Sequence, residues 1–334
     1  MRAWLLSRPG PIERAPLALR ELEPRAPGPG EIELEVHVCG VCRTDLHLVE
    51  GELAPHRPEV VPGHQIVGRV RTLGAGATRF ALGDRVGIAW LWRSCGVCEY
   101  CMGSAENLCR APRFTGWDEH GGYAERACVP QDFAYALPDA LDDEAAAPLL
   151  CAGIIGYRSL RRSRIQPGGR LGLYGFGSSA HIALQVAKTW SCRIFVVTRE
   201  ATHRALASEL GAEWAGDLGE RPPEPLDAAV LFAPVGTLVP VALAALRPGG
   251  TLACAGIHMT QIPPLDYAAH LFDERTLTSV TANTRADGRE LLELAARASI
   301  RPHTTAFAFA DANRALLALK QGLIAGSAVL RVRG

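Results

Sequence analysis

Short alternating apolar segments dominate the first part of the chain. The runs EIELEVHVCG (31–40), QIVGRVRTLG (65–74) and GDRVGIAW (83–90) place apolar side chains at about every second position, and Gly, Pro and Asp separate them. Alternation with a period of two is typical of half-buried strands, and the breakers between the runs favour tight turns. This part of the chain is therefore predicted to be mainly β, with small antiparallel strands.

The pattern changes near residue 152, where apolar runs begin to alternate with helical stretches. RLGLYG (170–175) precedes a helical stretch over 178–190, and RIFVVT (193–198) precedes a second one over 203–215. Such alternation indicates βαβ units and a parallel sheet. The second part of the chain is therefore predicted to be an α/β domain.

Two further segments bear on the topology. Pro-Gly-Gly at 167–169 and again at 248–250 launches an apolar run each time, so both are predicted to be turns that enter strands of one sheet. The segment 311–334 has the pattern of a helix followed by a strand. That pattern is compatible with a return to the first domain and equally with an extension of the second.

Length, charge and cysteine usage exclude several classes of protein. With 334 residues, 48% of them hydrophobic, the chain can bury two cores. Its 35 basic and 35 acidic residues are intermingled, so we expect neither a nucleic-acid nor a membrane partner. The apolar run at the N-terminus is too short for a signal sequence, and no stretch matches a membrane span. We expect a cytoplasmic protein whose ten cysteines are reduced.

Four cysteines lie close together in the run CGVCEYCMGSAENLC. This spacing allows a single loop to wrap one tetrahedral metal ion, and four thiolates leave no position for a substrate. The sequence therefore predicts a closed, structural zinc site formed by Cys95, Cys98, Cys101 and Cys109.

A glycine-rich motif follows the strand predicted at 171–174 and precedes the helix predicted from 178. It fits the pattern G-x-G-x-x-G/A, in which the glycines allow a tight turn and close approach of a pyrophosphate to a helix N-terminus. We expect this loop to bind a dinucleotide through Gly175, Phe176, Gly177, Ser178, Ser179 and Ala180.

The end of the next strand bears on which dinucleotide is bound. An acidic residue there bonds the ribose 2′-hydroxyl of NAD, whereas an arginine accommodates the 2′-phosphate of NADP. The chain has Thr198 and Arg199 at this point, which favours NADP(H). Glu200 follows directly and leaves NAD(H) open.

Three separated segments offer a second metal set. Cys42 lies in CGVCRTDLH, His64 in VPGHQIVG and Cys151 in APLLCAGIIGY. Two thiolates and one imidazole leave the fourth position of zinc free, and Cys₂His is the known catalytic zinc set of alcohol dehydrogenase. The combination predicts an open zinc site.

With these motifs in this order, the chain resembles the zinc-containing alcohol dehydrogenases of the medium-chain dehydrogenase/reductase superfamily over nearly its full length. The resemblance implies a mainly-β, GroES-like catalytic domain formed by 1–150 and 286–334. It implies a Rossmann domain with a doubly wound parallel sheet over 151–285, and places substrate and nicotinamide in the cleft between domains.

The resemblance also implies roles for individual residues. Asp45 matches a carboxylate behind the metal that orients a ligand imidazole, and Arg43 matches a contact to the cofactor pyrophosphate. Thr44 matches the hydroxyl that bonds the substrate oxygen, and His47 the last member of a proton relay to solvent. The implied reaction is reversible oxidation of an alcohol to an aldehyde or ketone, with two zinc ions per subunit and NAD(P).

Three positions depart from the family pattern. Gln65 replaces a glutamate behind the metal, and Ser327 replaces an arginine that contacts the cofactor phosphates. Leu53 stands where ethanol-specific relatives carry tryptophan, while Trp90 and Trp117 still provide aromatic walls. The pocket is therefore expected to be roomier than one for ethanol and to accept medium-chain or aromatic primary alcohols.

Two alternatives remain open at this point. One is another oxidoreductase of the superfamily, acting on a polyol, a formaldehyde adduct or a conjugated double bond. The other is a noncatalytic nucleotide-binding protein, although Thr44 and His47 would then have no purpose. The resemblance further implies a homodimer or a homotetramer.

Overall fold

The computed structural model describes residues 1–333, which pack as two units. Unit 1 comprises Met1–Cys151, Ala282–Ala296 and 303–333, and unit 2 comprises Ala152–Thr281 and Arg297–Pro302. Among the described residues, every helix is too short or too polar to span a lipid bilayer.

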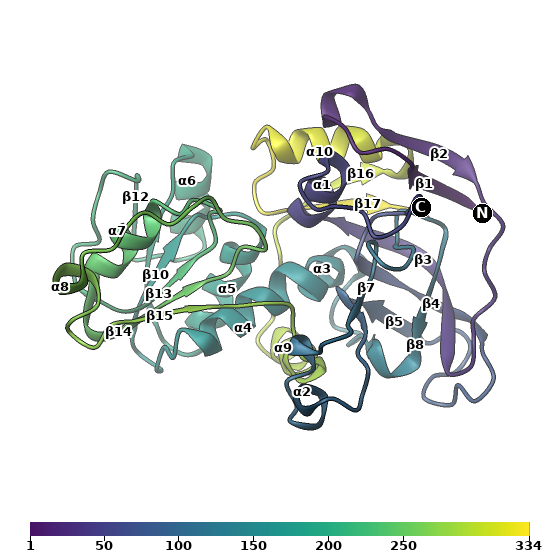
Figure 1. The fold of residues 1–334 in the computed structure, drawn as a ribbon, viewed down its shortest axis with the longest axis horizontal. Coiled ribbons are helices and arrows are strands. Elements are labelled where there is room, and N and C mark those ends of the chain that lie inside the picture. Colours follow the sequence, from purple (N-terminus) through teal and green to yellow (C-terminus); the bar gives the residue numbers. More distant parts are fainter. Residues whose placement is uncertain (334) are drawn as a thin grey trace. The chain divides into compact units, whose positions relative to one another are not determined.

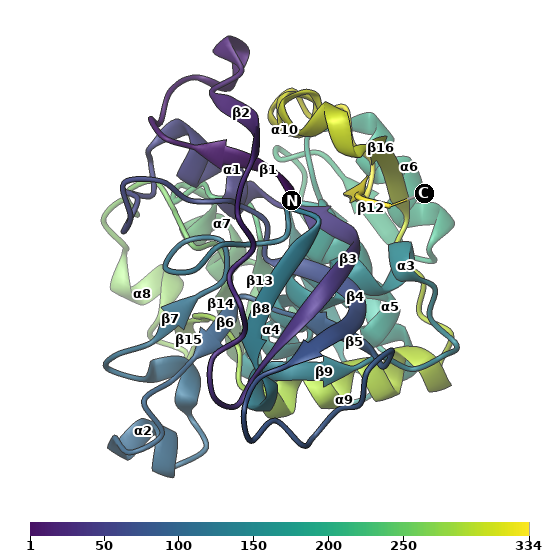
Figure 2. The ribbon, with the colours of Figure 1, turned by 90° about the vertical axis from the view of Figure 1, so that its right-hand side faces the viewer.

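Unit 1 is built around a seven-stranded sheet in the order β16-β17-β3-β4-β5-β9, with β8 also paired to β3 (Figure 2). All pairs are antiparallel except β16 with β17. The strands are β3 (Glu31–Val41), β4 (Gln65–Leu73), β5 (Arg85–Ile88), β8 (Arg126–Pro130), β9 (Ala134–Ala136), β16 (Thr304–Ala308) and β17 (Ser327–Arg331). The antiparallel strands predicted from the alternating runs are thus confirmed.

Smaller elements complete unit 1. Two short ribbons pair β1 (Arg2–Leu6) with β2 (Leu17–Glu21) and β6 (Leu91–Arg93) with β7 (Arg113–Phe114). The helices are α1 (Arg43–Glu50), α2 (Glu99–Met102), α3 (Asp143–Pro148), α9 (Arg285–Arg297) and α10 (Ala312–Lys320), with short 3₁₀ turns at Ile12–Arg14, Glu106–Leu108, Gln131–Phe133 and Phe309–Asp311. Helix α9 extends one residue beyond unit 1.

Unit 2 is a parallel sheet of six strands in the order β12-β11-β10-β13-β14-β15 (Figure 1). The strands are β10 (Arg170–Tyr174), β11 (Arg193–Val197), β12 (Trp214–Gly216), β13 (Leu226–Leu231), β14 (Leu246–Cys254) and β15 (Thr276–Ser279). The helices are α4 (Ile154–Arg162), α5 (Ser178–Thr189), α6 (Ala201–Glu209), α7 (Leu238–Ala244) and α8 (Tyr267–His270). Central strands such as β10 are buried on both faces, which explains their continuous apolar runs.

Two points left by the sequence are decided here. Strand β17 pairs with β3, so the C-terminal helix and strand return to unit 1. The Pro-Gly-Gly at 167–169 is a turn before β10, whereas that at 248–250 lies inside β14, where the register against β13 is interrupted. The second motif is therefore an irregularity within a strand, because β14 already begins at Leu246.

Candidate metal centre and cofactor loop

The three residues of the predicted open zinc site come together within unit 1. The metal-binding atoms of Cys42, His64 and Cys151 all lie within 4.8 Å of one another. The Nε2 atom of His64 is 3.2 Å from the Sγ atom of Cys151. The side chain of His64 is buried, while the two cysteines are partly exposed.

The local structure around Cys42 explains its position. Cys42 is the N-cap of α1, and Asp45, three residues later, accepts a hydrogen bond from the Cys42 backbone N–H across 2.9 Å. This reciprocal arrangement satisfies donors that a helix N-terminus otherwise leaves unpaired. The start of α1 therefore holds both a ligand sulfur and the carboxylate behind the metal.

Cys151 is presented by an unusual helical segment. Residues Leu149–Gly153 form a π-helical turn between α3 and α4. Such turns are rare and are frequent at functional sites, because they rotate side chains relative to a regular helix. Pro148 immediately precedes the turn and removes a backbone donor from the helix, which is consistent with the change in geometry.

Asp45 orients the imidazole of His64. Its Oδ1 atom accepts a hydrogen bond from His64 Nδ1 across 2.9 Å, so Nε2 faces the two sulfurs. Burial opposes a positive charge on His64, but the charge and hydrogen bond of Asp45, together with Cys42, raise the pKa of the ring to about 10. The negative charges around His64 that favour a positively charged ring would also favour a divalent cation beside Nε2.

These residues fit zinc. Bond lengths of about 2.0–2.3 Å place the ligand atoms of a tetrahedral zinc roughly 3.5–3.8 Å apart. The three ligand atoms here lie within 4.8 Å of one another, and one pair is 3.2 Å apart. The imidazole is held by a carboxylate on its other nitrogen, as metal-binding histidines usually are. With three protein ligands, one coordination position would be left for a substrate.

The four clustered cysteines form a second, independent set. Cys95, Cys98, Cys101 and Cys109 also have their sulfur atoms within 4.8 Å of one another, on a loop that includes α2. Backbone N–H groups surround these sulfurs, and those of Cys101 and Arg110 lower the pKa of Cys98 to about 6. A thiolate at near-neutral pH suits zinc, and four of them close the coordination shell.

Of the two predicted relay residues, Thr44 lies beside the open site, and His47 follows on the same helix. Thr44 is buried in the first turn of α1, and its hydroxyl is 3.8 Å from the sulfur of Cys42. His47, one turn later, forms a very short contact with the carboxylate of Glu52. Arg43 is exposed at the start of the same helix.

Aromatic rings extend outward from His64. Trp90 contacts His64 edge to face, with ring centroids 5.0 Å apart, and stacks against Trp117 at 5.8 Å. Phe114 stacks against Trp90, and His56 stacks against the outer side of Trp117 at 3.9 Å. Leu53, by contrast, is a half-buried residue packed against the core of unit 1.

Gln65 directly follows the ligand His64 in the chain. It is buried at the start of β4, opposite Gly40 of β3. A Cβ atom at Gly40 would lie 2.6 Å from the Gln65 side-chain oxygen, so the amide lies over the glycine. Ser327, another of the three positions that depart from the family pattern, is buried at the start of β17.

The glycine-rich loop in unit 2 has the predicted strand and helix flanks. Gly175 follows β10 with φ of +84°, and a Cβ atom there would lie 2.8 Å from the backbone nitrogen of Ala233. Gly177 precedes α5, and a Cβ atom there would meet no atom within 4 Å. Phe176 and Ala180 are buried, whereas Ser178 and Ser179 are half-buried at the start of α5. Open space before a helix N-terminus fits a pyrophosphate.

The end of β11 carries a small polar network. Thr198 is buried and donates to Glu200 across 3.3 Å, while Arg199 contacts the same carboxylate at 3.2 Å. His203 lies 3.5 Å from it. The Arg199 side chain is 73% exposed, so it is accessible to a ligand at this end of the sheet.

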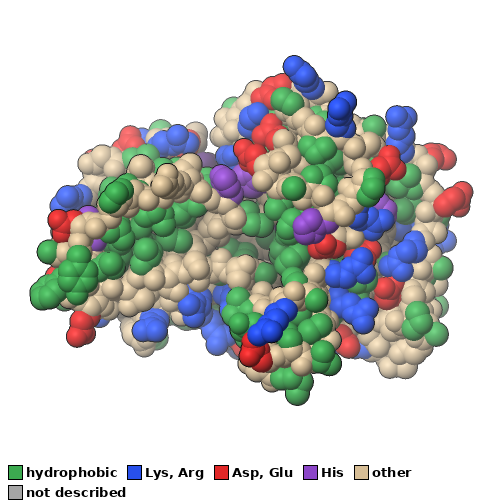
Figure 3. Space-filling view, in the orientation of Figure 1, with side chains coloured by type: hydrophobic (Ala, Val, Ile, Leu, Met, Phe, Trp, Pro, Cys, Tyr) green, Lys and Arg blue, Asp and Glu red, His purple; other side chains and the backbone are tan. Residues whose placement is uncertain are grey.

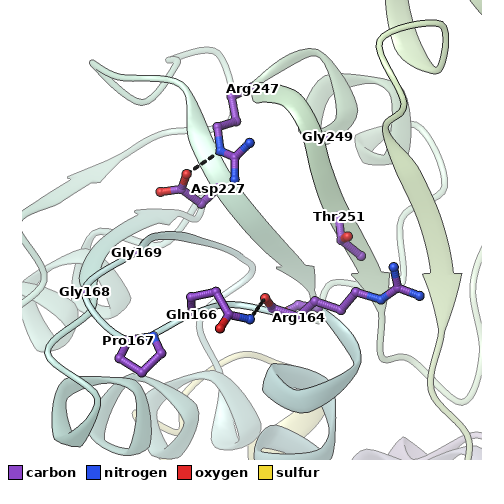
Figure 4. A pocket seen from close by; sticks show the side chains of 10 residues that line it. Arg164, Gln166, Pro167, Gly168, Gly169, Asp227, Arg247, Gly249 and Thr251 are labelled. Atoms are coloured by element: carbon purple, nitrogen blue, oxygen red, sulfur yellow. Dashed lines mark hydrogen bonds and ion pairs between the residues drawn. The ribbon is translucent and has the colours of Figure 1, made fainter.

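A polar hollow of about 300 Å³ lies at the opposite end of the same sheet (Figure 4). It is lined by the turn 167–169 and by Gly249, with Arg247 and Asp227 joined by an ion pair. Asp227 also accepts a hydrogen bond from the backbone N–H of Arg170. The hollow therefore belongs to the amino-terminal ends of the strands, away from the glycine-rich loop.

The sequence of this chain is similar to those of known alcohol dehydrogenases. The family model "Alcohol dehydrogenase GroES-like domain" matches residues 28–139, and "Zinc-binding dehydrogenase" matches residues 180–297. The probable alcohol dehydrogenase AdhA of Mycobacterium tuberculosis is 54% identical, covering 99% of this chain and 97% of its own. The chain belongs to the zinc-containing alcohol dehydrogenases of the medium-chain superfamily.

Solved structures of alcohol dehydrogenases share the fold. A cinnamyl alcohol dehydrogenase (SbCAD4) from Sorghum bicolor is 27% identical with a TM-score of 0.91, covering 100% of this chain and 98% of its own. The cobalt- and zinc-bound thermostable alcohol dehydrogenase from Pyrobaculum aerophilum is also 27% identical, with a TM-score of 0.90 over 99% of both chains. The present chain is thus a zinc-dependent, NAD(P)-dependent alcohol dehydrogenase, with a structural Cys₄ site and a catalytic Cys-His-Cys site.

Sequence reasoning missed several residues of the dehydrogenase site. Glu52 pairs with His47, Phe114 and His56 extend the aromatic wall, and Tyr123 donates to Asp45. Glu52 is only five residues from His47, so the sequence could have indicated this pair. No local pattern indicates His56 or Tyr123, because their partners are distant in the chain.

Proposed function

We propose that this enzyme reversibly oxidises medium-chain or aromatic primary alcohols and prefers NADP(H). The single observation that carries the substrate proposal is the row of rings from His64 through Trp90 to Trp117. Aromatic rings that begin at a metal ligand favour substrates with extended or planar groups, since contact area supplies the binding free energy.

The chain's own residues would position and deprotonate the alcohol. When bound, zinc supplies Lewis acid catalysis and the nicotinamide exchanges a hydride with the substrate carbon. Thr44, beside Cys42, would take the proton of the alcohol and give up its own hydroxyl proton to the relay, from which His47 would pass a proton to solvent. Glu52 holds the His47 ring, which keeps one nitrogen oriented for transfer. Arg43, at the start of α1, would contact the cofactor pyrophosphate.

The similarity to a cinnamyl alcohol dehydrogenase supports an aromatic substrate, because that protein is named for an aromatic primary alcohol. The test is to measure the oxidation of ethanol, hexanol, benzyl alcohol and cinnamyl alcohol. The absorbance of the reduced nicotinamide reports each rate. We expect the highest kcat/KM for hexanol or an aromatic alcohol. The highest value for ethanol would contradict it.

The preference for NADP(H) depends on Arg199. Its guanidinium is exposed at the end of β11, and Glu200 is already engaged by Thr198, Arg199 and His203. The variant Arg199→Ala should weaken NADPH binding and leave NADH binding nearly unchanged. Equal losses for both cofactors, or tighter NADH binding by the unmodified enzyme, would contradict the preference.

The protein would assemble as a homodimer or homotetramer. Figure 3 shows hydrophobic side chains gathered over the α7, α8 and β14 region of unit 2, and the exposed residues there include Val241, Ile257, Ile262, Tyr267 and Phe272. The neighbouring β15 is the last strand of its sheet. Light scattering should give the mass of a dimer or tetramer, and Phe272→Glu should lower it. A monomeric unmodified enzyme would refute the assembly.

Two further parts of the proposal concern organisation. The catalytic domain would comprise 1–150 and 286–334, and the cofactor domain 151–285. Limited proteolysis should release an intact 151–285 fragment.

The protein would be cytoplasmic, which subcellular fractionation with an antibody tests directly.

A further inference from the structure

The carboxylate of Asp45 accepts hydrogen bonds at both oxygens. Oδ1 accepts from His64 Nδ1 at 2.9 Å and from the Gly63 backbone N–H at 3.1 Å. Oδ2 accepts from the Cys42 backbone N–H at 2.9 Å and from the Tyr123 hydroxyl at 3.3 Å. Three of these donors belong to the segments that carry zinc ligands, and Tyr123 supplies the fourth from a distant segment.

Tyr123 is held rigidly. Its side chain is fully buried, and its ring lies against Gly63, where a Cβ atom would come within 2.4 Å of a ring carbon. Its backbone N–H donates to Pro62 at 3.0 Å, and its carbonyl accepts from Trp4 at 2.8 Å. A hydroxyl buried in this way requires a hydrogen-bond partner, and the Asp45 carboxylate is that partner.

The two oxygens of Asp45 serve different parts of the site. Oδ1 fixes the His64 ring, whereas Oδ2 fixes the backbone of Cys42 at the start of α1. Rotation of the carboxylate would disturb both ligands at once. A rigid donor on Oδ2 opposes this rotation, because the carboxylate cannot turn without losing the bond.

We propose that Tyr123 is a positioning residue of the catalytic zinc site, which locks the Asp45 carboxylate and thereby slows the release of zinc. Groups that hold a metal-bound imidazole affect both its orientation and its basicity. Tyr123 acts one step further out, through Asp45. Its hydroxyl adds nothing to the packing on Gly63, which the ring alone provides.

The chain offers a matched control. Tyr135 is a second buried tyrosine of unit 1, and its hydroxyl accepts a hydrogen bond from Asn283 at 3.2 Å, not from a group of the metal site. Replacing either tyrosine by phenylalanine removes one buried hydroxyl and keeps the ring. The four-cysteine zinc provides an internal reference within each protein.

The experiment measures zinc release from the zinc-loaded full chain into a chromogenic chelator, for the unmodified enzyme, Tyr123→Phe and Tyr135→Phe. The kinetic phase that disappears in a Cys42→Ala variant belongs to the catalytic ion. We expect Tyr123→Phe to accelerate that phase roughly three- to tenfold and to leave the structural phase unchanged. Tyr135→Phe should alter neither phase.

Two results would overturn the proposal. An unchanged catalytic phase in Tyr123→Phe would show that the hydroxyl has no effect on zinc retention. Equal acceleration of both phases would show that the variant merely loosens unit 1. Both rates of zinc release are measured without turnover, so the result does not depend on the identity of the substrate.

Discussion

Single side chains differ sharply in what they contribute to the catalytic zinc site. Cys42, His64 and Cys151 donate to the metal, whereas Asp45 only accepts hydrogen bonds from the groups around it. Removal of a donor therefore removes the ion, while removal of a supporting residue changes how firmly the ion is held.

The variant Cys42→Ala tests the role of a ligand. Two zinc sites are present, so the zinc content should fall from two ions per chain to one. Turnover should fall below detection, and binding of the reduced cofactor, measured by its fluorescence, should persist because the glycine-rich loop is unaffected. As a control, Cys192→Ala removes a buried thiol outside both clusters and should retain both ions. Full activity in Cys42→Ala would refute the assignment.

His120 provides a pH-dependent contribution to stability. Burial, and then the charges of Arg57 and Arg25, lower its pKa from 6.5 to about 4. Its Nδ1 atom accepts a hydrogen bond from the Val61 backbone N–H at 3.1 Å, which also requires the neutral ring. As pH falls below 6.5, the unfolded chain takes up a proton that the folded chain still excludes, so stability is lost between pH 6.5 and 4.

The comparison of the unmodified enzyme with His120→Gln measures this contribution. Between pH 7 and pH 5 the free energy of unfolding of the unmodified enzyme should fall by on the order of 1 kcal/mol more than that of the variant. Urea unfolding at the two pH values gives both numbers. Loss of zinc at low pH affects both proteins alike, so parallel slopes would contradict the prediction.

At the scale of elements, the connection between a strand and a helix determines where the cofactor can bind. The turn between β10 and α5 contains two glycines with different constraints. Gly175 has a positive φ and lies against the backbone of Ala233, whereas Gly177 borders open space at the start of the helix. A side chain at Gly175 would strain the backbone, while one at Gly177 would enter the open space that we expect to hold the cofactor phosphates.

A pair of variants separates these two constraints. Gly177→Val should weaken NAD(P)H binding by about tenfold or more and leave the melting temperature nearly unchanged, because no atom opposes the first carbon. Gly175→Ala should lower the melting temperature by several degrees. Cofactor titration and calorimetry on both variants check this. Reversed effects would place the phosphates elsewhere.

At the scale of elements, most strands and helices follow from local patterns. The helix predicted over 203–215 is wrong beyond Glu209, because Trp214–Gly216 form strand β12. The predicted segments 65–74 and 193–198 match β4 and β11 to within one residue, because alternation and burial leave their mark on neighbouring positions. The π-helical turn at Leu149–Gly153 was not anticipated. Its sequence is compatible with a regular helix, and only the surrounding structure selects the wider turn.

For the whole molecule, the four-cysteine loop is a separate stabilising device. Its neighbours Val97, Met102 and Leu108 are exposed, so the loop has little apolar core to hold it and depends on its metal ion. The variant Cys101→Ser should lose one zinc ion per chain and lower the temperature of half-inactivation by several degrees. Turnover at low temperature should persist, because the catalytic set is separate.

A half-buried cysteine outside both clusters supplies the control for this experiment. Cys128→Ser changes a thiol of the same unit and should retain both ions and the normal heat resistance. Metal analysis and residual activity after heating are the measurements. Heat resistance of Cys101→Ser equal to that of the control would show that the loop does not depend on zinc.

How much of the site was predictable depends on separation along the chain. The structural zinc site lies within one short loop, so its spacing alone predicts its chemistry. The catalytic set was predicted from residues that are individually ambiguous, with help from the resemblance to known dehydrogenases. The resemblance also implied the role of Asp45, but the part played by Tyr123 was not predicted, because these two residues lie 78 positions apart and no local pattern joins them.

Local sequence was sufficient for most strands and helices, for the glycine-rich turn and for the closed zinc loop, since each depends on interactions between near neighbours. Tertiary structure alone decided that β17 pairs with β3 and that His64 meets Cys151 across 87 positions. It also decided that Tyr123 closes the hydrogen bonds of Asp45. These contacts are made only after strands and helices pack, because packing determines which distant side chains share one buried space.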